Sequence, residues 1–299
     1  MPDLTRRSLL GTAASMIATR SAAAQTKPTA PVAYTTFAKQ SVQLRPFVGR
    51  QVALLVDPAR SVDRVVSDRV LSALDRAWDW YRSYFGRTPQ PYNPHAGKLT
   101  VAEVAAGGSA ITGYGGIELH TDTMTRLLTE ARTDRYNQAT FFFFGYNFWF
   151  FNDPLGRIAA FTEGFCHVHR FHSMEALGLT GAPWDGNIDF DHYRYSIIID
   201  MLTRYLADRT LTWENTLAAN KAPANPHGWV AADLGAAFYH RIRRDHGHAG
   251  YRRFWQLMAD APKAEKPRDS AARFVQIARA ATGEDYRWLM RDPSLPIVY

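Results

Sequence analysis

The spacing of apolar residues in the first 120 positions predicts a small strand-rich region. Residues 50–57 form an apolar run, and residues 98–104 and 114–120 form two more of strand length. Between the first two runs, residues 61–85 place apolar side chains on one helical stripe, with Ser61 as the candidate N-cap. The pattern therefore predicts three strands and one long helix in this part of the chain.

Beyond this region the apolar spacing is helical almost throughout. The predicted helices cover residues 122–131, 134–151, 158–177, 190–207, 229–246, 249–260 and 269–282, with a last turn near 285–290. Strands come first and helices follow, an order typical of α+β proteins rather than of alternating β–α units. We predict a single domain over residues 41–299, with a β-rich lobe at 41–120 and a helical lobe at 121–299.

The N-terminus has the features of an export signal. Arg6 and Arg7 precede a short apolar stretch, and the small residues 21–24 offer a cleavage point. We expect residues 1–24 to be a twin-arginine signal peptide, followed by a flexible lead-in at 25–40. This predicts a periplasmic or extracellular protein. The apolar stretch is too short to cross a bilayer, so no transmembrane segment is expected.

Composition changes this picture mainly through the aromatic residues. The net charge of +7 falls to +5 without the +2 of residues 1–24, and its arginine clusters favour solvated helix faces over a nucleic-acid surface. The single Cys166 excludes a disulfide framework.

Nine aromatic residues occupy positions 141–151. This run is either a buried core helix or the floor of a groove whose rings suit sugars, aromatic side chains or lipids.

The densest set of ligand-type side chains follows the aromatic run. Glu163 and His167 lie four residues apart on one face of a predicted helix, where they could supply two zinc ligands, with a third from elsewhere. The alternative is that the histidines of this helix cap, stack or face solvent. Further candidates are Cys166, His169 and His172, and a second polar cluster at Asp189, Asp191 and His192. The chain contains no H-E-x-x-H, G-x-S-x-G or P-loop motif.

Three segments, taken in order, carry a family resemblance. They are G-Y-G-G-I-E-L at 113–119, F-F-F-G-Y-N-F-W at 142–149 and T-E-G-F-C at 162–166. They resemble, respectively, the substrate-binding edge strand, the H-E-x-G-H-N-x-x zinc helix and the N-E-G-F-A segment of gluzincin metallopeptidases, the aminopeptidase-N-like zincins. With the C-terminal stretch, the resemblance covers residues 50–297 and implies a zincin-like fold.

The same resemblance implies that the zinc motif is degenerate. It places Phe142 and Tyr146 at the two histidine positions and Phe143 at the general base, so that only Glu163 is retained. Phenylalanine has no lone pair and can neither hold zinc nor activate water. No cofactor is expected, and any metal would be ligated by Glu163 and His167. Without a cation, a buried Glu163 is expected to find an Arg, His or Tyr nearby, with His167 or Tyr146 as the candidate partner, or to have a raised pKa.

These observations favour a secreted gluzincin-like protein that is not a peptidase of the usual zincin type and that binds a peptide or glycan in the ancestral groove. The alternatives are a hydrolase with a relocated site on Glu163 and His167, with or without metal, and a purely structural helical protein. No nucleic-acid partner is expected. The predicted catalytic residues are Glu163, His167 and Tyr146, and the predicted substrate-binding residues are Gly115, Gly116, Glu118, Phe142 and Phe143.

Overall fold

The computed structural model describes residues 29–105, 110–112, 115–184 and 187–297. The predicted signal peptide lies outside the described residues. The strands are β1 (Val32–Thr35), β2 (Ser41–Val48), β3 (Val52–Val56), β4 (Leu99–Val104), β5 (Ala110–Thr112), β6 (Ile117–His120), β7 (Arg135–Tyr136) and β8 (Thr180–Gly181). The α-helices are α1 (Arg64–Phe85), α2 (Thr121–Ala131), α3 (Gln138–Asn147), α4 (Asn152–Leu155), α5 (Ala159–Ala176), α6 (Phe190–Tyr195), α7 (Met201–Ala207), α8 (Ala231–Ala259), α9 (Pro267–Thr282) and α10 (Arg287–Met290). Single π-helical turns cover Ser196–Asp200 and Glu214–Ala218.

The first six strands form one mixed sheet in the order β1-β2-β3-β4-β6-β5. The centre is parallel, because β3 pairs with β4 and β4 with β6, while β1, β2 and β5 run antiparallel to their neighbours. Every residue of β3 and β4 is buried, as expected of strands covered on both faces. The α+β prediction is therefore confirmed: a sheet is followed by a helical region.

The longest helix of the N-terminal half, α1, packs against this sheet. It begins three residues later than predicted, because Asp63 rather than Ser61 is the N-cap and accepts a hydrogen bond from the backbone N–H of Val65. It ends at Gly86, whose φ of 69° allows its N–H to reach the carbonyl of Arg82. The apolar stripe of this helix lies in the main hydrophobic core.

Two sequence expectations near the sheet are wrong. The lead-in predicted at 25–40 contains β1, whose Tyr34 is buried and donates a hydrogen bond from its hydroxyl to Glu118. The segment predicted as an edge strand contributes β6, which lies inside the sheet between β4 and β5. The edge is β5, which pairs antiparallel with β6.

The helical lobe is organised around α5, which packs against α3 on one side and α8 on another. Glycines allow both contacts to be close. A Cβ on Gly145 of α3 would lie 2.7 Å from Cα of Cys166, and a Cβ on Gly164 of α5 would lie 2.7 Å from the backbone nitrogen of Ala236 in α8. The three helices therefore approach each other backbone to backbone.

Several predicted helices differ from the observed ones in their ends or continuity. The helix expected at 134–151 is only α3, because Asn137 caps it and the preceding residues pair with β8. The helix expected at 190–207 is interrupted by the π-helical turn Ser196–Asp200. Those expected at 229–246 and 249–260 are one element, α8, with a kink at Gly247.

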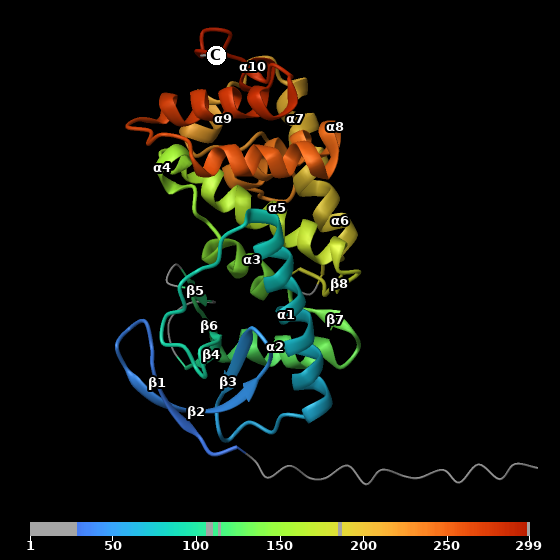
Figure 1. Cartoon of the computed structure of the whole chain (residues 1–299). Helices are drawn as coiled ribbons and strands as arrows, with labels where there is room; N and C mark the ends of the chain where they lie inside the picture. The colour runs from blue at the N-terminus through green and yellow to red at the C-terminus, as the bar shows by residue number, and fades with distance from the viewer. Residues whose placement is uncertain (1–28, 106–109, 113–114, 185–186, 298–299) are drawn as a thin grey trace, which may run out of the picture.

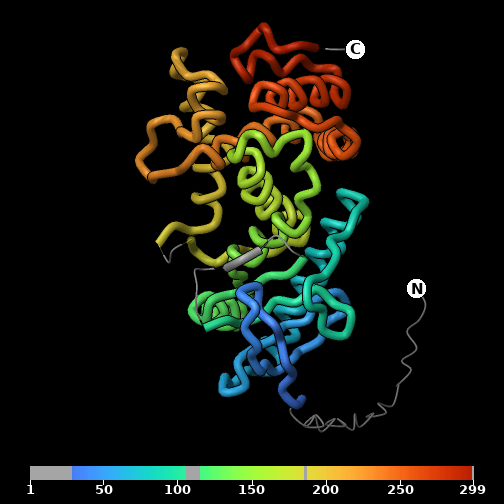
Figure 2. Tube along the Cα trace, turned by 90° about the vertical axis from the view of Figure 1, so that its left-hand side faces the viewer, coloured from blue at the N-terminus to red at the C-terminus, as the bar shows by residue number. Residues whose placement is uncertain are grey.

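The molecule is elongated, with its sheet at one end and helices α8 and α9 at the other (Figure 1). The perpendicular view shows the same arrangement, with the green and yellow segments that include α3 and α5 lying between the two ends (Figure 2). Within the described residues, no helix combines the length and the apolar character needed to cross a bilayer.

Candidate binding pocket

The aromatic run on and after α3 is divided between two environments. Phe141, Phe144, Phe148 and Phe151 are at most 1% exposed and belong to the main core. Their spacing of three to four residues places them on one side of the segment. The remaining rings, which include Phe142, Phe143 and Tyr146, are only partly buried. The run is therefore core on one side and surface on the other, so both sequence interpretations apply to part of it.

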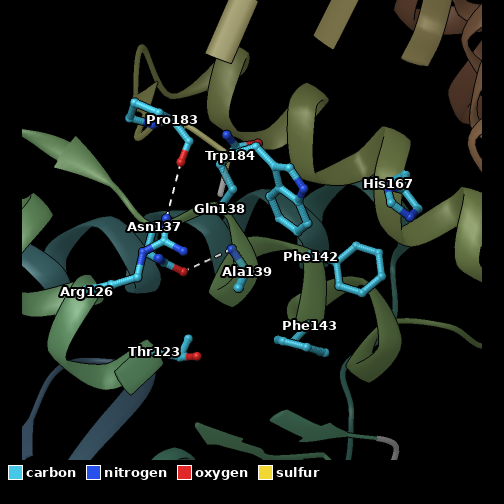
Figure 3. Close-up of a pocket in the computed structure, with 10 residues that line it drawn as sticks. All are labelled: Thr123, Arg126, Asn137, Gln138, Ala139, Phe142, Phe143, His167, Pro183 and Trp184. Atoms are coloured by element: carbon cyan, nitrogen blue, oxygen red, sulfur yellow. Dashed lines mark hydrogen bonds between the residues drawn. The ribbon is translucent and has the colours of Figure 1, made fainter. Parts of the chain in front are cut away.

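Phe142 and Phe143 line a pocket of about 430 Å³ between α2, the N-terminal end of α3, α5 and the loop after β8. Figure 3 shows Arg126 and Asn137 toward one side of this pocket and Phe142 and His167 toward the other. The lining is mainly apolar, with a few polar side chains, which is typical of small-ligand sites. Its residues are Thr123, Arg126, Asn137, Gln138, Ala139, Phe142, Phe143, His167, Pro183 and Trp184.

The polar end of the pocket is held by hydrogen bonds at the start of α3. Asn137 caps the helix by accepting from the N–H of Ala139 (3.1 Å) and donates to Glu130 (3.0 Å). Arg126 donates to Glu130 (3.1 Å) and to the carbonyl of Pro183 (3.2 Å; Figure 3). These bonds fix α2, α3 and the loop after β8 relative to one another.

The opposite end contains His167, whose Nδ1 lies 3.1 Å from Nη2 of Arg170. An arginine can only donate, so Nδ1 accepts and the neutral ring carries its proton on Nε2. Oδ1 of Asp233 in α8 lies 3.4 Å from the same Nδ1. Burial, with the nearby charge of Arg170, holds the pKa of His167 well below its ordinary value. Burial also raises the pKa of Asp233 to about 6.

Arg170 itself is fully buried behind the pocket wall. Its guanidinium carbon lies 4.4–5.6 Å from the ring centroids of Phe171, Tyr193, Trp184 and Phe142. Aromatic faces attract a cation more strongly when water is excluded. Two of these rings, Phe142 and Trp184, also line the pocket. They therefore separate the buried guanidinium of Arg170 from the pocket.

Glu163 and Tyr146 lie near each other, but neither lines the pocket that His167 lines. Glu163 is exposed, so the expectation that it lies buried is wrong, although the expected neighbour Tyr146 is nearby. Tyr146 is partly buried, and its pKa is raised by burial and by the nearby Cys166 and Glu163. Of the predicted catalytic residues, only His167 lines the pocket, where its hydrogen-bond partner is Arg170.

The predicted substrate-binding residues separate into two groups. Phe142 and Phe143 line the pocket, whereas Gly115, Gly116 and Glu118 do not. Gly115 has a φ of 73°, and a Cβ there would clash with the carbonyl of Gln90. Gly116 accepts a hydrogen bond at its carbonyl from Asn147. These two glycines therefore have packing roles.

Glu118 is 1% exposed and accepts hydrogen bonds from Tyr34 (3.1 Å) and from the backbone N–H of Phe37 (2.6 Å). Burial raises its pKa. It borders a separate, smaller cavity next to the β1–β2 hairpin. Glu118 thus connects β6 to the hairpin and lies away from the pocket.

The other candidates on α5 are also buried in the core. Cys166 is fully buried, and burial raises its pKa, which disfavours the thiolate form that a nucleophile requires. His169 contacts the carbonyl of Phe165 and the hydroxyl of Tyr251, and His172 contacts His240. His169 is stacked on Tyr251, which fits the alternative of stacking histidines, whereas Nδ1 of His172 has no hydrogen-bond partner among the described residues.

The chain was compared with protein-family models, with curated proteins and with solved structures. No protein-family model and no curated protein matches the chain. Its structure is similar to a mutant of a functionally unknown conserved protein from Bacillus anthracis str. Ames, with a TM-score of 0.58, 10% identity and 85% of this chain covered. It is also similar to the ZmpB metallopeptidase from Clostridium perfringens, with a TM-score of 0.52, 10% identity and 88% of this chain covered.

The fold is zincin-like. This chain spans about half the length of these two structures, 49% and 48% respectively. Within the described residues, no three His, Cys, Asp or Glu side chains come together in a group that could hold a metal ion. The residues at the zinc positions implied by the resemblance, Phe142, Phe143 and Tyr146, offer one phenol and no imidazole or carboxylate. They do not fit the zinc chemistry of this fold.

The residues around the pocket that sequence reasoning missed include Gln138, Arg170, Trp184 and Asp233. Arg170 follows His167 by three residues, the helical spacing of a contact, and this signal was available. Asp233 and Trp184 come from segments distant in sequence, so their positions depend on the tertiary fold. Gln138 lies at the start of α3, and the predicted start of this helix, residue 134, was four residues too early.

Proposed function

We propose that this protein is a zincin-fold binding protein without zinc peptidase chemistry, which holds a peptide or glycan in the pocket beside α3. The proposal rests on which residues form the wall of the pocket. At the helix positions where the resemblance implies two histidines and a glutamate, the chain has Phe142, Tyr146 and Phe143, and two of these rings line the pocket. Rings bind ligands by stacking and apolar contact, not by activating water.

The first test is metal content combined with activity. Purified protein, dialysed against zinc and then against buffer, is expected to retain far less than one equivalent of zinc by elemental analysis. It should also show no hydrolysis in a peptide and glycan screen, while binding a member of the same screen. Stoichiometric zinc together with hydrolysis would overturn the proposal.

A gain-of-function variant tests whether α3 corresponds to the zinc helix. The triple substitution Phe142→His, Phe143→Glu and Tyr146→His restores an H-E-x-x-H pattern at partly exposed positions. With Glu163 available, the variant is expected to bind about one equivalent of zinc. The same triple variant with Glu163→Ala is the control and should bind zinc more weakly. A folded triple variant that gains no zinc affinity would contradict the assignment of α3.

The relocated hydrolase is the weaker candidate. A general base at His167 would need a free nitrogen lone pair facing substrate, but Arg170 already donates to Nδ1, and the other nitrogen carries the proton. Glu163 is exposed rather than paired with His167. Any hydrolysis found in the screen should be tested with Glu163→Ala and His167→Ala. Activity lost in both variants would favour the hydrolase.

We also propose that the protein is exported through the twin-arginine pathway. The support is the order of Arg6, Arg7, an apolar stretch and small residues at 21–24. Replacing both arginines by lysine should leave the protein in the cytoplasmic fraction of a host with this pathway. Export that persists unchanged in this variant would contradict the proposal.

A further inference from the structure

Gln138, a residue of the pocket lining, carries a buried acceptor. Its side chain is 2% exposed, and its Nε2 donates to the carbonyl of Ala182 at 2.6 Å. Its Oε1 has no hydrogen-bond partner among the described residues, although Gln138 is part of the pocket lining. A buried acceptor without a partner costs on the order of 1–3 kcal/mol. A ligand that donates a hydrogen bond to Oε1 would remove this cost.

His167 presents a donor to the same pocket. Because Arg170 occupies Nδ1, the proton of the ring is on Nε2. The described residues supply no acceptor for this N–H within hydrogen-bond distance, and 13% of the side chain is exposed. The ligand therefore meets an acceptor at Gln138 and a donor at His167.

Between these polar groups the wall is aromatic and close to neutral. Trp184 and Phe142 lie on the Arg170 side, and the ring of Trp184 is stacked on Tyr193, with centroids 4.9 Å apart. Among the described residues of the lining, Arg126 is the only one with a formal charge. Its Nε lies 3.1 Å from Oε1 of Glu130, which neutralises it. The pocket thus favours a neutral ligand with a flat apolar face.

We infer that the pocket binds a neutral pyranose, stacked on the rings of the wall, with one hydroxyl donating to Oε1 of Gln138 and another oxygen accepting from Nε2–H of His167. A hydroxyl can donate and accept, and a pyranose carries several around a ring with apolar C–H faces. A phenylalanine side chain contacts the rings but has no polar atom, so a peptide would need a backbone N–H at Oε1 and a carbonyl at Nε2–H while its ring stays on the wall. The inference rests on the proposed binding function and narrows its ligand class from peptide or glycan to glycan.

The experiment measures binding of two sets of small probes to the purified full chain. The sugars are the methyl glycosides of glucose, galactose and N-acetylglucosamine. The peptide analogues are the N-acetyl amides of phenylalanine and tyrosine. Saturation-transfer NMR detects contact and calorimetry gives the dissociation constant. At least one sugar is expected to bind saturably and more tightly than either amide.

Two variants and one matched control locate the binding. Gln138→Met removes the acceptor, and Phe143→Leu removes a ring of the wall while leaving Gln138 unchanged. Each substitution should raise the dissociation constant of the sugar by about tenfold, which is the effect of losing one good contact. Thr140→Val is the control, because Thr140 is also a buried, unpartnered polar residue of α3 but does not line the pocket. It should bind sugar like the unchanged protein, and circular dichroism should show all three variants folded.

The outcomes separate the inference from the proposed function. Binding of the amides but not of the sugars, weakened by Phe143→Leu, would overturn the pyranose assignment and leave a peptide-binding protein. Sugar binding that is equally strong in both pocket variants would place the sugar elsewhere and also overturn the inference. Failure of every sugar, amide and longer peptide or glycan to bind would overturn the proposed function as well.

Discussion

At the scale of single residues, the wall of the pocket depends on a positive charge that water does not reach. Arg170 is fully buried. Its positive charge is stabilised by four aromatic faces, by the lone pair of His167 and by the nearby carboxylate of Asp233. A buried ion normally needs close partners to offset its desolvation. Here it also determines which nitrogen of His167 carries the proton, so one buried side chain sets the chemistry of a neighbour that lines the pocket.

Replacing Arg170 by methionine removes both the donor to Nδ1 and the nearby charge. The pKa of His167 should therefore rise, although burial, its larger cause, should still keep it below the ordinary value. NMR of the imidazole nitrogens as a function of pH would measure both the pKa and the tautomer. Arg170→Lys keeps the charge and serves as the control. An unchanged titration of His167 in Arg170→Met would contradict this role.

At the scale of elements, α3 and α5, which both line the pocket, lie close together, and α5 lies equally close to α8. Gly145 and Gly164 allow this, because each faces the backbone of the next helix at a distance that excludes a methyl group. Alanine is the better helix former by about 1 kcal/mol, so propensity and packing predict opposite effects at these positions. The measured sign of the substitution tells which of the two dominates.

Gly164→Ala is expected to lower the free energy of unfolding by about 1–3 kcal/mol, because α5 and α8 must separate to admit the methyl group. Chemical denaturation followed by circular dichroism measures the change. The adjacent Glu163→Ala, on an exposed position of the same helix, should change stability by no more than about 0.5 kcal/mol. A more stable Gly164→Ala variant would show that the helices are less tightly packed than described.

At the scale of the whole molecule, the buried histidines make stability depend on pH. Burial lowers the pKa of His169 to about 3 and of His240 to about 4, and holds those of His167 and His172 well below the ordinary value. In the unfolded chain these residues bind protons near pH 6.5. Below that pH the unfolded state therefore takes up protons that the folded state does not, and stability falls.

Asp233 acts in the opposite direction. Its pKa is raised to about 6, so the folded state binds this proton from about pH 6 downward, whereas the unfolded chain does so only near pH 4. Four histidines outweigh one aspartate, since each group contributes about 1.4 kcal/mol per pH unit within its window. Urea unfolding should therefore give a lower free energy at pH 5 than at pH 7, and His240→Gln should reduce this slope. A flat profile would contradict the neutral state of these histidines.

The sequence was informative about fold class and about the location of the pocket. Apolar runs predicted β3 and β4, an apolar stripe of helical spacing predicted α1, and the order of strands and helices predicted the α+β class. The strand β1 was missed because its inward positions are few and polar residues surround it, so its pairing with β2 depends on tertiary contacts. The break between α6 and α7 was missed because a π-helical turn leaves the apolar pattern nearly unchanged.

The candidate site was only partly predictable for the same reason. Phe142 and Phe143 stood out by composition, and His167 by its residue type. Glu163 was expected to be buried because the resemblance placed it next to a metal, yet the helix turns it toward solvent. Gln138 and Trp184 gave no sequence signal, since a buried acceptor or a shared wall exists only once distant segments have come together.

The two-sided arrangement of α3 has a consequence for how such a protein changes over evolutionary time. Phe141, Phe144 and Phe148 on and next to α3 serve the core, so selection for a folded chain acts on them, while Phe142 and Phe143 line the pocket and are free of that role. Partly exposed positions tolerate substitution with small changes in stability. The chain can therefore exchange one recognition surface for another by single substitutions that leave the core intact. Substitutions on one side of such a helix change the pocket surface, and the core on its other side stays the same.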